Sequence, residues 1–219
     1  MAALATTAPT IFRLCLTGGP CGGKSTLLEQ LKTNLARRGF DVLCAPEVPT
    51  IMIRGGAVYP GHDGGEKLLA FETAIIRLQM QLEDAFSMVA VSTGKPSIIV
   101  MDRGLLDIPA YLPSAQWHEV LKANGTTEAA LSARYDMVLH LVTAADGAEA
   151  YYTTVNNAAR TETAEQARAL DASIRENWTR AHSNVVVVDN SGSDFAEKVR
   201  RCVDAVVRDV EIKSARGIV

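Results

Sequence analysis

The sequence lacks the features that mark membrane-spanning, secreted and nucleic-acid-binding proteins. It has no run of about eighteen apolar residues, the length that a transmembrane helix needs. Its first ten residues contain no lysine or arginine and no apolar core of the signal-peptide type. The net charge is −3, so there is no basic excess for binding nucleic acid. We therefore expect a cytoplasmic protein with no membrane span and no nucleic-acid partner.

Cysteine and histidine are also sparse. Four cysteines and four histidines are scattered through 219 residues, and no C-x-x-C spacing occurs. This dispersal suggests neither a zinc site nor a disulfide framework. We expect the histidines to be ordinary surface or core side chains and the thiols to stay reduced.

Apolar runs typical of strands alternate with helical patterns along the chain. The hydrophobic content of 47% is ample for one core, so we expect a flexible leader over residues 1–10 and a single domain over residues 11–219. Alternation of this kind predicts an α/β fold with a parallel sheet. The expected strands cover residues 11–17, 40–47, 97–102, 135–142 and 184–190. The expected helices cover residues 24–38, 66–93, 114–124, 162–181 and 193–213, with a glycine-rich loop over residues 53–65.

The helix expected over residues 66–93 is the longest, and Gly94 and Pro96 end it. Its apolar side is expected to consist of Leu68, Leu69, Ile75, Ile76, Leu78, Leu82, Phe86 and Val89.

The strongest motif is LTGGPCGGKST, which joins the first expected strand to the first expected helix. It matches the pattern G-x-x-x-x-G-K-[ST] at Gly18, Gly23, Lys24 and Ser25. Glycines let successive backbone N–H groups point inward around an anion, and the helix start adds the positive end of its dipole. The motif predicts a nucleoside triphosphate site, although a glycine-rich turn without a ligand is the alternative. The expected nucleotide-binding residues are Gly18, Gly19, Pro20, Cys21, Gly22, Gly23, Lys24, Ser25 and Thr26.

Charged side chains follow the second and third expected strands, and ligands bind at the carboxyl ends of parallel strands. Asp102 ends a buried strand, where its carboxylate could hold Mg²⁺ opposite the Ser25 hydroxyl. Arg103 beside it offers a fork for phosphate oxygens. Glu47, after the second strand, could accept or position the proton of an attacking hydroxyl. The alternatives are a turn-capping aspartate and a surface glutamate.

Two later segments carry further candidates. Arg160 precedes a helix and could close over the phosphates to neutralise transferred charge, unless that helix is simply solvated. Asn190 and Ser191 follow the last strand and could border the base pocket, or form a plain turn. The sequence has no N-K-x-D stretch, and DRGL at residues 102–105 departs from the D-x-x-G of a GTPase switch. Adenine is therefore favoured over guanine.

These stretches resemble the P-loop kinases that include deoxynucleoside and thymidylate kinases. More closely, LTGGPCGGKST, APEVPT, IIVMDRGLLDIPAYL and VVVVDNSGSDFAEKV resemble an AAA-type ATPase and kinase-like family. That family includes the nicotinamide riboside kinase domain of a bacterial NAD regulator and the P-loop domain of an insect photoreceptor-channel (TRP-channel) translocation protein. The resemblance implies a three-layer α/β/α P-loop NTPase fold with five parallel strands in the order 2-3-1-4-5.

The resemblance also implies phosphoryl transfer from ATP with Mg²⁺. It assigns Lys24 to the phosphates, Glu47 to the catalytic base, and Asp107 and Tyr111 to the acceptor side. No signature names the acceptor, so we expect an unidentified small molecule such as a nucleoside, a nucleotide or a related metabolite. The alternative is a nucleotide-hydrolysing switch that acts on a protein partner.

Overall fold

The computed structural model describes residues 10–61, 65–152 and 163–215. At its centre is a five-stranded sheet in the order β2-β3-β1-β4-β5, and every described strand pair is parallel. The predicted fold class and strand order are confirmed. The strands are β1 (Ile11–Thr17), β2 (Asp41–Ala45), β3 (Ser97–Asp102), β4 (Met137–Leu141) and β5 (Val185–Val188).

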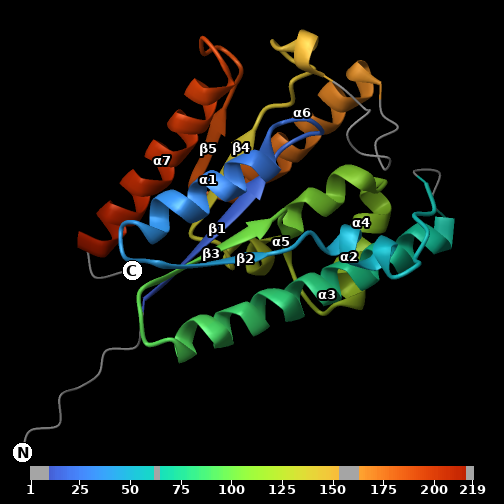
Figure 1. Cartoon of the computed structure of the whole chain (residues 1–219). Coiled ribbons are helices and arrows are strands. Elements are labelled where there is room, and N and C mark those ends of the chain that lie inside the picture. The colour runs from blue at the N-terminus through green and yellow to red at the C-terminus, as the bar shows by residue number, and fades with distance from the viewer. Residues whose placement is uncertain (1–9, 62–64, 153–162, 216–219) are drawn as a thin grey trace, which may run out of the picture.

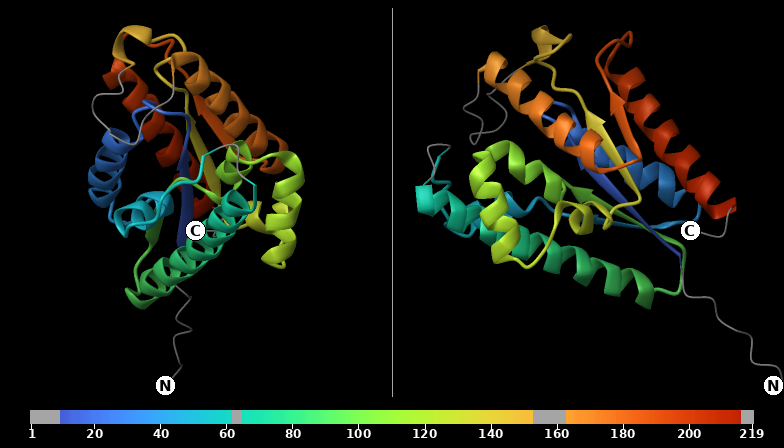
Figure 2. Two further views of the ribbon diagram at one scale, coloured as in Figure 1. Left: turned by 90° about the vertical axis from the view of Figure 1, so that its right-hand side faces the viewer. Right: turned by 180° about the vertical axis from the view of Figure 1, so that it is seen from behind.

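Helices cover both faces of the sheet and complete the three layers (Figure 1). One face packs against α1 (Lys24–Ala36) and α7 (Phe195–Ala215). The opposite face packs against α2 (Val48–Arg54), α3 (Gly65–Ser92), the 3₁₀ segment η1 (Leu105–Tyr111), α4 (Ser114–Ala123), α5 (Glu128–Ser132) and α6 (Ala164–Ala181). A short 3₁₀ turn, η2 (Glu149–Tyr151), follows β4. The two further views show the same arrangement of layers (Figure 2).

The strands divide their side chains between the two layers with a period of two. Along β1, Leu14 and Leu16 lie in the cluster with α1 and α7, whereas Cys15 lies in the cluster on the opposite face. All three are 0% exposed. Because both faces are covered, the strands are continuous apolar runs rather than alternating ones. This is why their positions could be predicted closely.

Four short helical elements were not predicted from the sequence: α2, η1, α5 and η2. α2 begins directly after Glu47 and carries Pro49 in its first turn, where the missing N–H costs nothing. The loop expected over residues 53–65 is therefore shorter, because Ile53 and Arg54 end α2 and Gly65 begins α3. The leader expected over residues 1–10 lies outside the described residues except for Thr10, and the single-domain assignment stays a prediction.

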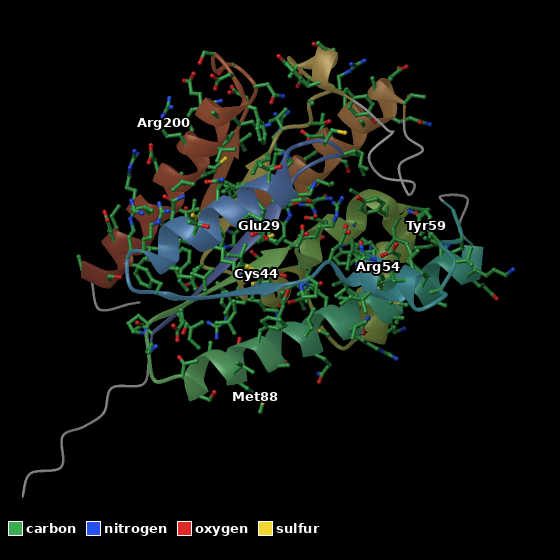
Figure 3. The ribbon with its side chains drawn as sticks, viewed as in Figure 1. Glu29, Cys44, Arg54, Tyr59, Met88 and Arg200 are labelled. Carbon is green, nitrogen blue, oxygen red and sulfur yellow. The ribbon has the colours of Figure 1, made fainter. Side chains whose placement is uncertain are left out.

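The apolar side predicted for α3 is partly wrong. Leu78 and Val89 were expected to be buried, but they are 37% and 54% exposed. The buried stripe of the helix instead includes the polar residues Glu72, Gln79 and Glu83. Met88 also lies on the outer surface of α3 (Figure 3). Within the described residues, no helix is long and apolar enough to cross a membrane.

Two leucines of α3 provide a matched test of this burial. Leu68 is 0% exposed in the core, whereas Leu78 is 37% exposed. We expect Leu68→Ala to lower the free energy of unfolding by about 2–5 kcal/mol, because it loses buried contacts and leaves a cavity. Leu78→Ala should change it by about 0.5 kcal/mol. Urea unfolding measures both, and equal losses would contradict the orientation of α3.

Candidate functional site

The loop between β1 and α1 depends on glycines that adopt conformations that other residues avoid. Gly18 has φ 132° and Gly23 has φ 93°. A Cβ on Gly18 would overlap the Leu141 carbonyl oxygen, and one on Gly23 would overlap the Phe195 ring. Gly18 is therefore required both by backbone conformation and by space, whereas Gly23 is required chiefly by conformation, because the exposed Phe195 ring can move.

The same loop leaves backbone donors free for an anion. Among the described residues, no hydrogen-bond acceptor takes the backbone N–H groups of residues 22–26. Gly23 precedes the first turn of α1 without a side-chain cap. First-turn N–H groups without partners, together with the helix dipole, form an anion site. Ser25 and Thr26 are exposed at this turn, and the predicted nucleotide contacts of residues 18–26 stay predictions.

The Lys24 side chain is hydrogen-bonded to the backbone of the loop. Its Nζ donates to the carbonyl oxygens of Gly18 and Gly19, each at 2.8 Å. Burial and the neighbouring Arg103 guanidinium lower the pKa of Lys24 to about 8. A phosphate oxygen arriving at the loop would offer this ammonium a stronger acceptor than either carbonyl.

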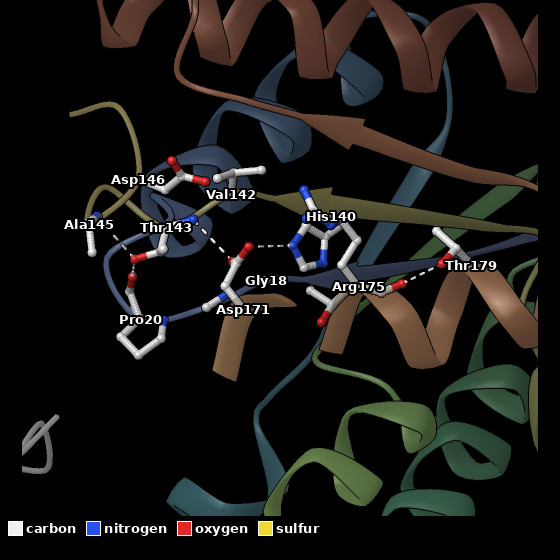
Figure 4. A network of polar contacts seen from close by, with 12 residues as sticks. Gly18, Pro20, His140, Val142, Thr143, Ala145, Asp146, Asp171, Arg175 and Thr179 are labelled. Carbon is white, nitrogen blue, oxygen red and sulfur yellow. Dashed lines mark hydrogen bonds and ion pairs between the residues drawn. The ribbon is translucent and has the colours of Figure 1, made fainter. Parts of the chain in front are cut away.

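A buried carboxylate that was not predicted accepts a hydrogen bond from the backbone of the loop. Asp171, on α6, is 3% exposed. Its Oδ1 accepts hydrogen bonds from the backbone N–H groups of Gly19, at 2.7 Å, and Thr143, at 3.0 Å. Its Oδ2 lies 3.2 Å from His140 Nε2 (Figure 4). Burial raises the pKa of Asp171, but the hydrogen bonds from His140 and the backbone outweigh it, so the net pKa is lowered.

Thr143 supplies the second support of the loop. Its hydroxyl donates to the Pro20 carbonyl oxygen at 2.5 Å (Figure 4). The Ala144 N–H donates to the Cys21 carbonyl oxygen at 3.3 Å. The segment after β4 is thus hydrogen-bonded to the middle of the loop. It positions the loop although it carries no predicted catalytic group.

A helical pattern could have revealed Asp171. The buried residues of α6 are Ala167, Asp171, Ile174 and Trp178, which recur at helical spacing. A carboxylate on an apolar stripe needs partners to be buried. Read this way, the pattern signals a polar network but does not identify the loop that it supports.

Asp102, Arg103 and Glu47 meet at the carboxyl ends of β3 and β2. Asp102 pairs in register with Leu16 of β1, one residue before the end of that strand. Arg103 has φ 71°, and its N–H donates to the Leu16 carbonyl oxygen at 2.9 Å. Its Nε donates to Glu47 Oε1 at 2.5 Å. The structure thus brings these three side chains together, while their predicted roles stay predictions.

Glu47 is held at the start of α2 by two donors on different oxygens. Arg103 takes Oε1, and the Thr50 hydroxyl donates to Oε2. Burial raises the pKa of Glu47, but the charge of Arg103 and the Thr50 hydrogen bond outweigh it and leave the pKa below its usual value. In contrast, burial and the negative charge of Glu47 raise the pKa of Asp102. A cation beside Asp102 would stabilise the ionised carboxylate and lower this pKa.

Asp107 lies beneath this pair and is 2% exposed. Its carboxylate accepts hydrogen bonds from the Thr17 hydroxyl, at 2.6 and 2.7 Å, and from Trp178 Nε1, at 2.6 Å. Arg103 Nη1 donates to it at 3.3 Å. The side chain thus supports Arg103 from below. Its predicted contact with an acceptor stays a prediction.

Tyr111 ends η1 on the same side of the sheet. Burial lowers the pKa of Arg103, but Tyr111 and two carboxylates outweigh it and raise that pKa well above its usual value. Tyr111 therefore lies within electrostatic reach of the guanidinium. Its predicted role in acceptor binding remains a prediction.

Asn190 and Ser191 follow β5 on the other side of the loop. The Asn190 amide donates to the carbonyl oxygens of Thr143, at 2.8 Å, and Asp146, at 2.6 Å. Its Oδ1 accepts from Lys198 Nζ at 2.7 Å. The Ser191 hydroxyl donates to Asp189 Oδ1 at 2.6 Å. These bonds tie the loops after β4 and β5 together, and the predicted nucleotide contacts stay predictions.

The structure tests neither the predicted role of Arg160 nor the predicted metal site. Arg160 lies outside the described residues, so its predicted action on the phosphates stays a prediction. No cluster of three or more histidine, cysteine or acidic side chains could hold a metal within the described part of the chain. A magnesium ion here would need a small ligand set completed by phosphate oxygens, as such ions commonly have. Ser25 and Asp102 carry oxygen donors of the kind that such a set uses, and their predicted role as Mg²⁺ ligands stays a prediction.

We expect Asp171→Ala to weaken both folding and nucleotide binding. It leaves the N–H groups of Gly19 and Thr143 buried without an acceptor, which costs about 1–3 kcal/mol each. Thermal unfolding and calorimetry with ATP and Mg²⁺ measure the two effects. Asp171→Asn retains an oxygen for both N–H groups and should lose less. Equal affinity of wild type and Asp171→Ala would contradict this support.

The lowered pKa of Lys24 predicts a pH dependence. Above pH 8, Lys24 is mostly neutral in the free protein. It must then take up a proton before its ammonium group can bind the phosphates. Affinity for ATP should therefore fall as the pH rises through about 8, by up to about tenfold per pH unit. Lys24→Arg keeps its charge and should bind ATP with a flat profile. The same decline in both proteins would assign the titration to another group.

Comparison with known families agrees with this geometry. A sequence model of a family described as an AAA domain matches residues 13–197, from β1 into α7. No curated protein matches the chain. The match and the observed topology identify a P-loop NTPase-like domain, whose general activity is the binding and hydrolysis of nucleotides. The chain belongs to the AAA domain family.

Proposed function

We propose that this protein is a kinase that transfers a phosphoryl group from ATP to a hydroxyl group of a small molecule. The observation that carries the proposal is the Glu47–Arg103 ion pair, which lies next to Lys24 at the carboxyl ends of the central strands. A hydrolysing switch must position a water molecule, whereas a kinase must position a hydroxyl group of its acceptor. The Glu47 carboxylate, which is fixed by Arg103 and Thr50, is suited to orient an acceptor hydroxyl.

The phosphate side of the site consists of the loop and Lys24. The free N–H groups of residues 22–26 would surround the phosphates, and Lys24 would exchange its bonds to Gly18 and Gly19 for phosphate oxygens. Mg²⁺, when bound by Ser25 and Asp102, would neutralise charge on the phosphates. The reaction is mainly a matter of positioning and charge neutralisation, and this chain supplies groups for both.

On the acceptor side, Glu47 would receive the proton that the attacking hydroxyl loses. The acceptor oxygen forms a bond to the γ-phosphorus, and the bond from that phosphorus to the oxygen of the leaving ADP breaks. The lowered pKa of Glu47 keeps its carboxylate ionised at neutral pH, so it is ready to accept a hydrogen bond. It also makes Glu47 a weak base, which fits proton transfer late in a loose transition state.

The acceptor class follows from the resemblance of the motifs. Their likeness to nucleoside and nicotinamide riboside kinases supports a nucleoside, a nucleotide or a related metabolite. The alternative, a hydrolysing switch that acts on a protein partner, is an outcome of the test. Purified protein is mixed with ATP, Mg²⁺ and single acceptors, and ADP and phosphorylated products are quantified. Product formation that depends on an acceptor supports the kinase, and acceptor-independent ADP release overturns it.

Within that assay, Glu47→Gln should lower kcat by about 10²–10⁴-fold. Because Glu47 is proposed to act on the acceptor rather than on the phosphates, the dissociation constant for ATP should change by less than about threefold. Glu29→Gln, on the exposed surface of α1 (Figure 3), is the matched control and should behave as wild type. Equal losses of kcat and ATP affinity would remove Glu47 from catalysis.

A further inference from the structure

Four acidic side chains are buried within the described residues, and three of them have hydrogen-bond donors. Asp107 and Asp171 each accept from three residues, as described above. Glu83 accepts from Gln79 Nε2 at 2.9 Å, Tyr135 Oη at 2.6 Å and Arg134 Nε at 2.6 Å. Partners of this kind are what a buried carboxylate requires.

Glu72 is the exception. It is 5% exposed and lies on the same face of α3 as Glu83. Leu68 and Ile76, one turn before and one turn after it, are both 0% exposed. No described residue donates a hydrogen bond to Glu72 or forms an ion pair with it. Burial alone raises its pKa to about 7. The Glu72 carboxylate therefore has no partner from the described chain, but its two oxygens are not fully enclosed and keep a small exposed area.

The position of Glu72 along α3 puts it on the acceptor side of the site. α3 has 28 residues and is about 42 Å long, whereas β3 has 6 residues and spans about 20 Å. α3 ends just before β3 begins and runs back along it. Its amino-terminal half therefore extends beyond the carboxyl end of the sheet, beside α2 and α4 (Figures 1 and 2).

The elements around this half of α3 carry the groups assigned to the acceptor. α3 contacts α2, which begins after Glu47, and η1, which ends at Tyr111. The ring of Tyr59, from the segment between α2 and α3, packs edge-on against Phe71, with centroids 5.6 Å apart. Glu72 is the next residue along the helix. An unpaired carboxylate thus lies among the elements that line the proposed acceptor site.

We infer that Glu72 binds a hydrogen-bond-donating N–H group of the acceptor and thereby selects which hydroxyl compounds are phosphorylated. This inference rests on the proposed function. A buried polar group without a partner costs stability, so a leucine or methionine here would suit folding better. A donor from the substrate supplies the missing partner. An acceptor that lacks the N–H group leaves the carboxylate unpaired, which is a strong basis for discrimination.

The experiment uses the full chain with adenosine, cytidine, guanosine and uridine and their counterparts methylated on the base N–H groups. Binding is measured by calorimetry with a non-hydrolysable ATP analogue and Mg²⁺, and transfer is measured with ATP. For the nucleoside that binds best, we expect removal of the N–H group and Glu72→Met each to weaken binding by about 10–100-fold. The two changes together should cost little more than either alone.

Stability provides a readout that does not need activity. Glu72→Met should raise the melting temperature of the ligand-free protein, because it removes an unpaired buried carboxylate. Glu83→Met is the matched control on the same helix face, and it should lower the melting temperature because it leaves Arg134 and Tyr135 without their acceptor. Glu72→Met should leave ATP affinity unchanged.

The outcomes separate this inference from the proposed function. If wild type transfers phosphate and Glu72→Met has the same acceptor KM, the inference fails and the kinase assignment stands. If nucleosides bind in a manner that depends on Glu72 but no transfer occurs, the binding role of Glu72 stands, whereas the kinase assignment and the selection of phosphoryl acceptors fail. A lower melting temperature for Glu72→Met, or no nucleoside binding to wild type, overturns the inference.

Discussion

All five strands run in one direction, and this constraint is what creates the site. Parallel strands must end at the same edge of the sheet, so the chain leaves β1, β2 and β3 at neighbouring points. The register that pairs Leu16 with Asp102 brings the phosphate loop, Glu47 and Arg103 together although they are distant in sequence. The free N–H groups of residues 22–26 are collected at this edge, where they can donate hydrogen bonds to a bound polyanion.

One helix, α6, contacts both the phosphate loop and the carboxylate beneath Arg103. α6 carries Asp171, which holds the loop through Gly19, and Trp178, which donates to Asp107 beneath Arg103. The two residues are seven positions apart and therefore lie two turns apart on one face. A single rigid element thus sets the position of both the phosphate loop and the ion pair. α6 therefore fixes the phosphate loop and the carboxylate beneath Arg103 relative to each other.

The fold was largely predictable from the sequence because its dominant signals are local. Strands covered on both faces are continuous apolar runs, and glycine and proline mark the ends of the long helices. The short elements α2, η1, α5 and η2 were missed because three to seven residues carry too little periodicity to identify. The polar residues on the buried stripe of α3 were missed for another reason, because apolar periodicity does not show which polar side chains find partners inside the protein.

The sequence by itself determined the anion-binding loop. The glycine spacing, the lysine and the hydroxyl of LTGGPCGGKST act within eleven neighbouring residues, so the backbone conformation that they require follows from local sterics. Only the tertiary structure decided how the distant carboxylates are used. Glu47 pairs with Arg103 and Asp171 supports Gly19, whereas Glu72 has no partner among the described residues. The physical reason is that the behaviour of a buried charge depends on which donors surround it, and chain topology brings those donors from elements far away in sequence.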